Sequence, residues 1–446
     1  MRYLPNTAED RRAMLAAIGV ASIEDLLVKI PPKARLSRPL GLPPALAETD
    51  LVRELRARAA LNADADGYVC FLGAGAYDHY VPSPIDHLVR RGEFFTAYTP
   101  YQPEASQGTL RTIYEYQTMI AELTGMDVAN ASLYDGASSL AEAVLMAQAA
   151  TGRSEVVLAG GVNPLYRRVA ATYAGRRLRL RDVPAPEGVL DADQARRLIG
   201  DRTAALVVQS PNFWGVLEDV AAAAEMAHAA GALLIVVADP VNLGVLEAPG
   251  RLGADIVVGE GQGLGVPLSY GGPYLGVFAA RQEFVRRLPG RLVGATVDLD
   301  GRRGFVLTLQ TREQHIRRAR ATSNICTNVA LCALMATIYL AILGKRGLVE
   351  VGEQSMAKAR YAAERLTAVP GVSLRFGAPF FKEFTLRLPR APERVVQRLL
   401  RDRILAGVPL KFFDRRLADC LLVAVTEKRT REEIDAFAEA LGRAVA

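Results

Sequence analysis

The chain has 446 residues and a formal net charge of +6, and 50% of its residues are hydrophobic. A chain of this length and balance is expected to form two or three globular units with a large core. The weak basic excess favours an acidic protein partner. No compact run of lysine and arginine with interleaved aromatic residues is present, which argues against nucleic-acid binding.

The sequence predicts neither a secretory signal nor a membrane anchor. The N-terminal run MRYLPNTAEDRRAML lacks the apolar core of a signal peptide. The apolar run at 325–343 contains Thr327, Asn328 and Thr337 and lies within a helical pattern. We therefore predict a buried helix there rather than a membrane span.

The cysteines favour a reducing compartment. They lie far apart, without the spacing of metal ligands, at Cys70, Cys326, Cys332 and Cys420. We expect buried free thiols, and a soluble protein located in the cytoplasm.

Residues 1–60 have a mostly helical pattern that is interrupted by the proline-rich stretch IPPKARLSRPLGLPPAL at 30–46. The two Pro-Pro pairs predict an extended segment, because proline and the residue before it disfavour helix. We interpret 1–60 as an N-terminal helical arm that wraps over a neighbouring subunit. The predicted large α/β domain follows at 61–312, and connecting helices with a small α+β domain at 313–446.

Short apolar runs alternate with helical patterns from about residue 108 to residue 285. The predicted strands are SEVVLAG (154–160), LRLRDV (178–183), AALVVQSP (204–211), LLIVVADP (233–240) and DIVVGEG (255–261). Helices are predicted between them, and two more precede the first strand. Strands that alternate with helices indicate right-handed crossovers and a mainly parallel sheet.

The pattern changes after Arg312. Long helical stretches are predicted from Glu313 to Ala368. They are followed by strands in VSLRFGAP (372–379), KEFTLRLP (382–389) and CLLVAVTE (420–427), and by helices at 392–406 and 431–445. Thr430 and Glu433 have the spacing of a capping box for the last helix.

Two features suit a ligand site at the carboxyl edge of this sheet. DGASS (135–139) begins a helix, where free backbone N–H groups can bind an anion, although an ordinary N-cap is the commoner reading of such a helix start. Asp239 ends a strongly apolar strand and would point into the site, or would cap the segment after Pro240.

Together with the glycine-rich turn at 259–267, these features follow the order found in fold-type I pyridoxal-phosphate enzymes. There, the helix start binds the phosphate, the aspartate pairs with the pyridinium nitrogen, and a lysine in the final turn forms the Schiff base. In this chain the lysine's place falls within Gly259–Gly263, which offers Glu260 and Gln262 instead. No lysine occurs from position 34 to position 344, so no nearby lysine is expected to replace it.

Several long runs carry a resemblance to a known family. They are FFTAYTPYQPEASQGTLRTIYEYQTMIAELTGMDVANASLYDGASSLAEA (94–143), FLGAGAYDHYVPSPIDHL (71–88), GEGQGLGVPLSYGGPYLG (259–276) and RATSNICTN (320–328). The chain resembles the N-terminal half of glycine decarboxylase, the P-protein of the glycine cleavage system, over essentially its whole length. Because its length corresponds to one half of the fused form, it resembles the alpha subunit (subunit 1) of the two-subunit enzyme.

The resemblance implies a fold-type I pyridoxal-phosphate-dependent transferase architecture and an oxidoreductase activity shared between two chains. In that family the beta subunit (subunit 2) carries the lysine and the pyridoxal phosphate, and the alpha subunit completes the active site. The pair, expected as a heterotetramer of two of each subunit, decarboxylates glycine and passes the aminomethyl group to the lipoyl arm of H-protein, releasing carbon dioxide. On this reading, the chain holds no covalent cofactor and is not active alone.

The candidate active-site residues lie in YTPYQPEASQG (98–108). Tyr98, Tyr101, Gln102 and Glu104 occupy a segment kept extended by prolines, and they suit the orientation of a small zwitterion such as glycine. From composition alone, a surface loop packed on the next helix is the simpler interpretation. The resemblance favours the functional one, because this loop is a signature of the family.

A second candidate is SYGGP (269–273), where the N–H groups of Gly271 and Gly272 could reach a phosphate held in the other subunit. A simple strand-to-strand turn explains the same residues equally well. The run Arg317, Arg318 and Arg320 would support an interface or form a solvated face.

No metal site is expected. His79 and His87 lie near Asp78 and Asp86, but a spacing of eight with intervening prolines does not match metal-ligand geometry. Two rival functions remain open: a structural partner that only stabilises the beta subunit, and an independent pyridoxal-phosphate lyase or aminotransferase. The lysine inventory argues against the second.

Overall fold

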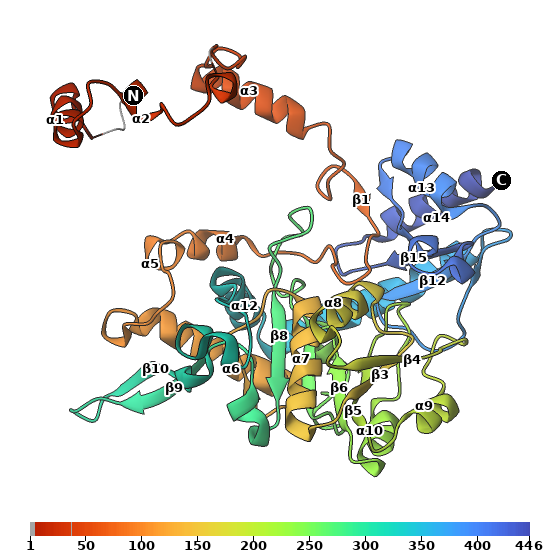
Figure 1. Ribbon diagram of the computed structural model, residues 1–446. Helices are drawn as coiled ribbons and strands as arrows, with labels where there is room; N and C mark the ends of the chain where they lie inside the picture. Colours follow the sequence, from red (N-terminus) through yellow and green to blue (C-terminus); the bar gives the residue numbers. More distant parts are fainter. Residues whose placement is uncertain (1–4, 37) are drawn as a thin grey trace. The chain divides into compact units, whose positions relative to one another are not determined.

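The structure is a computed structural model that describes residues 5–36 and 38–446 (Figure 1). The chain divides into two compact units, Met1–Ala63 and Asp64–Ala446. The boundary predicted at residue 312 within the second unit stays a prediction.

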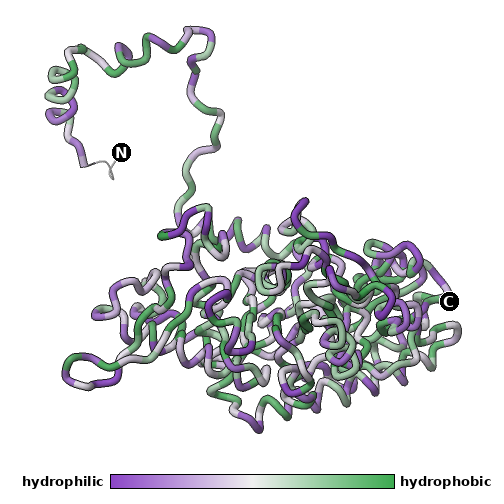
Figure 2. The backbone as a smooth tube through the Cα atoms, turned by 60° about the horizontal axis from the view of Figure 1, so that its bottom comes forward, coloured by the Kyte–Doolittle hydropathy of each residue, from purple (hydrophilic) through white to green (hydrophobic). Residues whose placement is uncertain are grey.

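The described part of Met1–Ala63 has no core of its own. It contains α1 (Ala8–Ile18), α2 (Ile23–Leu26), η1 (Pro32–Ala34) and α3 (Glu48–Ala59), and none of the residues in these elements is buried. Figure 2 shows apolar stretches along this unit. Exposed large apolar side chains here include Met14, Ile18, Leu26, Val28, Leu42, Leu55 and Leu61.

A seven-stranded sheet forms the centre of Asp64–Ala446, in the order β2-β8-β7-β6-β5-β3-β4. Its strands are β2 (Val128–Ala129), β3 (Glu155–Ala159), β4 (Arg179–Val183), β5 (Thr203–Gln209), β6 (Leu233–Val237), β7 (Ile256–Glu260) and β8 (Gly276–Ala280). The five strands from β4 to β7 pair in parallel, whereas β8 is antiparallel to both β7 and β2. The predicted α/β class with a mainly parallel sheet is confirmed.

The inner strands are almost entirely apolar because both faces of the sheet are covered. Every residue of β3 and of β8 is buried, whereas the edge strand β4 is partly exposed. The helices that precede or connect the strands are α6 (Gln107–Thr124), α7 (Gly136–Thr151), α8 (Pro164–Ala174), α9 (Ala192–Leu198) and α10 (Val220–Ala229). Figure 1 shows α7 lying along the strands, and most of its residues are buried.

The segment after the sheet is less regular. β9 (Leu292–Val297) and β10 (Arg303–Thr308) form an antiparallel hairpin. Short helical turns follow, and then the long helix α12 (Ala330–Thr367), which is interrupted at Gly344 with φ 58° and ψ −173°. The short elements in this part and before the sheet are α4 (Ser83–Val89), α5 (Gly92–Phe95), η2 (Pro103–Ala105), η3 (Asn242–Gly244), η4 (Gln282–Arg287), η5 (Gln310–Arg312), α11 (Gln314–Arg317) and η6 (Arg318–Arg320).

The C-terminal part contains a smaller antiparallel sheet in the order β11-β12-β15-β14. Its elements are β11 (Ser373–Leu374), β12 (Glu383–Arg387), α13 (Pro392–Arg401), β14 (Val408–Pro409), η7 (Leu410–Phe412), η8 (Arg415–Leu417), β15 (Cys420–Ala424) and α14 (Arg431–Val445). β1 (Val69–Cys70) pairs in parallel with β13 (Ile404–Leu405). The predicted capping box at Thr430 and Glu433 is present.

Four predicted details are wrong. Residues 321–329 are not helical, the strand predicted at 372–379 shortens to Ser373–Leu374, Cys326 is exposed rather than buried, and the helix predicted at 392–406 ends at Arg401, before the strand β13. The first and third share a cause. In this segment side chains replace helical hydrogen bonds: Ser323 Oγ accepts from the Ile325 N–H at 3.0 Å, and Arg291 donates to the Cys326 carbonyl at 2.8 Å.

By length and composition α12 is apolar enough to cross a membrane. Its first half nevertheless belongs to the main hydrophobic core of the protein, to which it contributes Cys332, Ala333, Leu334, Ala336 and Tyr339. This agrees with the buried helix that the sequence predicts.

Candidate functional site

The carboxyl ends of the parallel strands meet the start of α7. Asp135 caps this helix, with Oδ1 accepting from the Ser138 N–H at 2.7 Å, so the N-cap reading of DGASS is correct. The first N–H of the helix, on Gly136, donates instead to Oε2 of Glu260 at 2.9 Å. Glu260 ends β7, and its other oxygen, Oε1, accepts from the N–H groups of Gln262 and Leu275 at 3.0 and 2.9 Å.

The space in front of the helix start is filled. A Cβ added at Gly136 would lie 2.6 Å from the Tyr166 hydroxyl and 3.0 Å from the Glu260 nitrogen. Burial raises the pKa of Glu260 to about 8, even though its backbone N–H donors oppose this shift. An anion that binds the Gly136 N–H would have to displace the Glu260 carboxyl.

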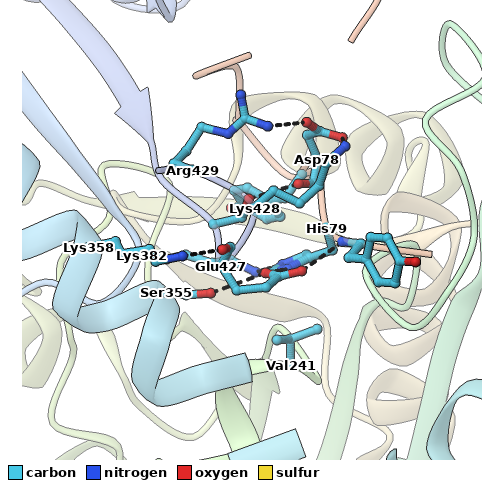
Figure 3. Close-up of polar contacts among 12 residues, drawn as sticks. Asp78, His79, Val241, Ser355, Lys358, Lys382, Glu427, Lys428 and Arg429 are labelled. Atoms are coloured by element: carbon cyan, nitrogen blue, oxygen red, sulfur yellow. Dashed lines mark hydrogen bonds and ion pairs between the residues drawn. The ribbon is translucent and has the colours of Figure 1, made fainter. Parts of the chain in front are cut away.

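A small cleft lies between Glu260 and Asp239. Asp239 follows β6 at the far end of this cleft and is paired with a lysine. The ammonium of Lys382 lies 2.6 Å from Asp239 Oδ2 and 2.7 Å from His79 Nε2. His79 Nδ1 in turn lies 2.6 Å from Glu427 Oε2 (Figure 3). The expectation that no lysine lies near the cleft is therefore wrong, because the segment just before β12 brings Lys382 there from the C-terminal part.

The contacts with Lys382 and Glu427 occupy both ring nitrogens of His79, one of the two histidines for which no metal site is predicted. His79 is buried, and Asp78 pairs with Lys428 at 2.6 Å and Arg429 at 3.0 Å (Figure 3). Asp86 forms an ion pair with Arg90. No cluster of three or more metal-ligating side chains occurs among the described residues.

The loop that carries the candidate tyrosines lies on the surface. Tyr98 is 83% exposed and Tyr101 46% exposed, and Gln102 and Glu104 are also exposed. The loop ends in the 3-10 turn η2. The described residues bring only Tyr101 into a defined polar site; the roles of all four stay predictions.

Tyr101 is held by a buried arginine that sequence reasoning missed. Arg291, which is 4% exposed, donates to the Tyr101 hydroxyl at 3.2 Å and to Thr327 Oγ1 at 2.7 Å. Its guanidinium also lies over the Tyr101 ring, 5.6 Å from the centroid. Arg291 therefore ties the tyrosine loop to the SNICTN segment.

A polar cavity of about 330 Å³ opens beside Tyr101. It is lined by Tyr101, Glu313, Gln314, His315, Arg318, Ile325 and Cys326. Arg318 belongs to the predicted arginine run, whose three members are all exposed on this chain. The cavity offers hydroxyl, imidazole and guanidinium groups to a small polar ligand or to a partner.

The turn between β7 and β8 is open. Gly271 is exposed and Gly272 partly exposed, with φ 120° and 133°. A Cβ at Gly271 would meet no atom within 4 Å, and the neighbouring Tyr270 is 74% exposed. Left-handed backbone is required here, which explains the glycines whether or not they contact a phosphate.

Residues 1–441 match the protein family described as Glycine cleavage system P-protein. The chain belongs to the glycine cleavage system P-protein family. It is 52% identical to a Desulforamulus reducens protein, over 99% of both chains, and 54% identical to a Chlorobium phaeobacteroides protein over the same share. Both relatives are named probable glycine dehydrogenase (decarboxylating) subunit 1.

The solved structures agree. A crystal structure of P-protein glycine decarboxylase in inhibitor-bound form is 48% identical, covers 100% of both chains and gives a TM-score of 0.90. Glutamate decarboxylase of Lactobacillus brevis gives a TM-score of 0.69 at 16% identity, over 96% of this chain and 97% of that one. At such identity the second likeness shows the fold alone, and it confirms the fold-type I architecture.

Pyridoxal phosphate, which this fold implies, does not fit the cleft of this P-protein chain. No lysine stands at 259–263, and the cavity between Asp239 and Glu260 measures about 30 Å³, whereas ligand pockets measure roughly 300–1,000 Å³. Lys382 is not placed to form the Schiff base, because its amine contacts Asp239. Asp239 is the residue that would pair with the pyridine nitrogen of the cofactor. The aldehyde, which would react with the lysine, is on the opposite side of the ring.

Proposed function

We propose that this chain is subunit 1 (alpha) of glycine dehydrogenase (aminomethyl-transferring). Together with a second subunit it decarboxylates glycine, passes the aminomethyl group to the lipoyl arm of H-protein and releases carbon dioxide. Two observations together support this proposal: the likeness to proteins named subunit 1, and the filled cleft. The chain matches proteins named subunit 1 over 99% of their length, at 52% and 54% identity, while its own cofactor cleft is filled.

The beta subunit supplies the Schiff-base lysine and holds pyridoxal phosphate, which provides the electron sink for decarboxylation. This chain binds none covalently. The pair assembles in the cytoplasm as a heterotetramer of two of each subunit. The exposed apolar side chains of Met1–Ala63 support a large subunit interface, because surfaces of this kind are normally covered by a partner.

The tyrosine loop is this chain's contribution to the shared site. Tyr98, Tyr101, Gln102 and Glu104 bind and orient glycine, and Arg291 holds the Tyr101 hydroxyl in place. We propose that the exposed turn with Gly271 and Gly272 contacts the phosphate in the partner. In the free chain the Gly271 N–H donates to the Leu268 carbonyl at 3.0 Å, so a contact through this N–H would require the turn to open. The exposure of Tyr98 supports a role at an interface, since a ring exposed to this degree adds little to this chain's own packing.

The test replaces Tyr98 and Tyr101 separately with phenylalanine, which removes each hydroxyl but keeps the ring. A hydrogen bond to a charged group is worth roughly 1.5–3 kcal/mol, so at least one variant should lose about tenfold or more in kcat/KM. Activity is measured as glycine–bicarbonate exchange with the reconstituted pair and lipoylated H-protein. Tyr173→Phe on α8 is the matched control and should keep its activity.

Near-full exchange by both loop variants, with normal assembly, would contradict a catalytic role for the hydroxyls. The chain would then be better described as a structural partner of the beta subunit. A loss in kcat would place the hydroxyl in the transition state, whereas a rise in KM alone would place it in substrate binding.

A further inference from the structure

The filled cleft has two ends that attract opposite charges. Asp239 at the end of β6 attracts a cation, and the N-terminus of α7 attracts an acceptor, because the first N–H groups of a helix have no partner within the helix and its dipole is positive there. In this chain both ends are occupied by side chains. Lys382 lies 2.6 Å from Asp239, and the carboxyl of Glu260 accepts from Gly136 at 2.9 Å.

We propose that Lys382 and Glu260 are built-in replacements for the two polar ends of a bound pyridine phosphate. The ammonium of Lys382 stands where a protonated ring nitrogen would meet Asp239, and the carboxyl of Glu260 stands where a phosphate would meet α7. The cleft is therefore a permanently filled structural site. This inference concerns this chain alone and does not depend on the reaction proposed for the pair.

The contacts of Lys382 suit an ammonium group. His79 Nδ1 lies 2.6 Å from the Glu427 carboxylate, and His79 Nε2 lies 2.7 Å from the Lys382 amine. With the ring hydrogen on Nδ1, Nε2 accepts from the amine, which also pairs with Asp239. Lys382 is 2% exposed and also lies 4.0 Å from the centroid of the Tyr77 ring.

This placement gives Lys382 a packing role that a cofactor would otherwise fill. Its neighbour Glu383 begins β12 in the C-terminal sheet, whereas Asp239 follows β6 in the central sheet. The ion pair therefore joins the two sheets through the filled cleft. A buried pair of this kind is costly to break from one side, because the remaining charge is left unpaired.

Glu260 and Gln262, the residues in the place of the lysine, are equally fixed. Glu260 accepts from three backbone N–H groups. Gln262 is buried, accepts from the Tyr77 N–H at 2.9 Å and donates to the Val266 carbonyl at 2.8 Å. The polar groups of Glu260 and Gln262 are therefore hydrogen-bonded within the chain. Asp239 Oδ2 has the Lys382 ammonium at 2.6 Å as its ion-pair partner but accepts no hydrogen bond of good geometry.

The first test removes both replacements in the full-length chain, as Lys382→Ala/Glu260→Ala. The probe is pyridoxamine 5′-phosphate, which cannot form a Schiff base with surface lysines. The double variant should bind it saturably at roughly millimolar concentration, with a rise in Tm, because binding to the folded state stabilises it. The wild type should show no shift, and each single variant should bind at least about tenfold more weakly than the double variant. Saturable binding by the wild type, or a folded double variant that does not bind, would overturn the proposal.

The second test stays informative if the double variant fails to fold. Lys382→Met and Asp239→Asn should each lower Tm, since each leaves a buried charged partner. The combination should recover more than half of the summed loss, because neither charge is then unpaired. Strictly additive losses would show that the two groups do not act as a pair, and would overturn the assignment of Lys382 as the internal cation.

Discussion

Glu142 on α7 shows how one buried acid affects the stability of the whole unit. Its side chain is 3% exposed and accepts from Ser323 Oγ at 2.8 Å. Burial raises the pKa of this carboxyl to about 7, although the Ser323 hydrogen bond opposes the shift. Because the folded-state pKa lies above the unfolded value, the protonated acid stabilises the fold below about pH 4.5, and this contribution is lost as the pH rises through about 7.

Glu142→Gln should remove that pH dependence, since an amide keeps an acceptor for Ser323 and never ionises. Relative to the wild type, the free energy of unfolding of the variant should rise by up to about 3 kcal/mol between pH 4.5 and 7. Urea unfolding at several pH values measures this difference. Glu115→Gln, at an exposed acid paired with Arg111 on α6, is the control. Its free energy of unfolding should differ from that of the wild type by the same amount at every pH. A flat difference for Glu142→Gln as well would contradict the burial argument.

Individual site residues differed in how far the sequence could predict them. Asp239 and Glu260 could be placed at the sheet edge, because each ends an apolar strand in a βα pattern. Lys382 and Arg291 could not, since they reach their partners through tertiary contacts that no local pattern contains. The only sequence observation that concerned lysine was its absence from position 34 to position 344, and it predicted that no lysine would lie near the cleft.

At the scale of elements, the strands and helices of the central sheet were predictable because apolar runs and turns set their limits. The segment 321–329 was not, because its polar side chains bind the backbone and replace a helix that the apolar pattern favours. α12 shows a related effect. Its pattern continues across Gly344, but the backbone there adopts φ 58° and ψ −173°, which is essentially restricted to glycine.

Gly344→Ala should therefore destabilise the protein through backbone strain alone, since an added Cβ meets no atom within 4 Å. The expected loss is on the order of 1–3 kcal/mol in the free energy of unfolding. Gly442→Ala in α14 is the matched control. It should raise the free energy of unfolding by about 0.5–1 kcal/mol, because alanine favours helix and the added Cβ would lie 4.0 Å from its nearest neighbour, Val369 Cγ1. Equal stability of Gly344→Ala and wild type would mean that the helix is continuous at this position.

For the whole molecule, the main unexplained surface is the described part of Met1–Ala63. It exposes large apolar side chains and buries none in its helices, which is unfavourable for a free chain in water. Obligate interfaces commonly bury more than about 2,000 Å². The exposed residues of this unit supply the apolar surface that such an interface needs.

Mixing the chain with the second subunit, which we propose bears the Schiff-base lysine, should raise the Tm of this chain and produce co-elution in gel filtration. Leu42→Asp should weaken that association without changing the Tm of the isolated chain, because Leu42 is 74% exposed. Arg53→Ala, at another exposed position of the same unit, serves as the comparison and should change neither the association nor the Tm appreciably. Separate elution and an unchanged Tm with the wild-type chain would contradict the proposed partnership.

We propose that the partner subunit, and not this chain, holds the cofactor. The most direct measurement is to incubate the reconstituted pair with pyridoxal phosphate, reduce with borohydride and determine the mass of each chain. The expected result is one stoichiometric adduct on the partner subunit and only scattered, substoichiometric labelling of this chain, because a Schiff base needs a suitably placed amine. A stoichiometric adduct on a single lysine of this chain, Lys382 included, would contradict the account.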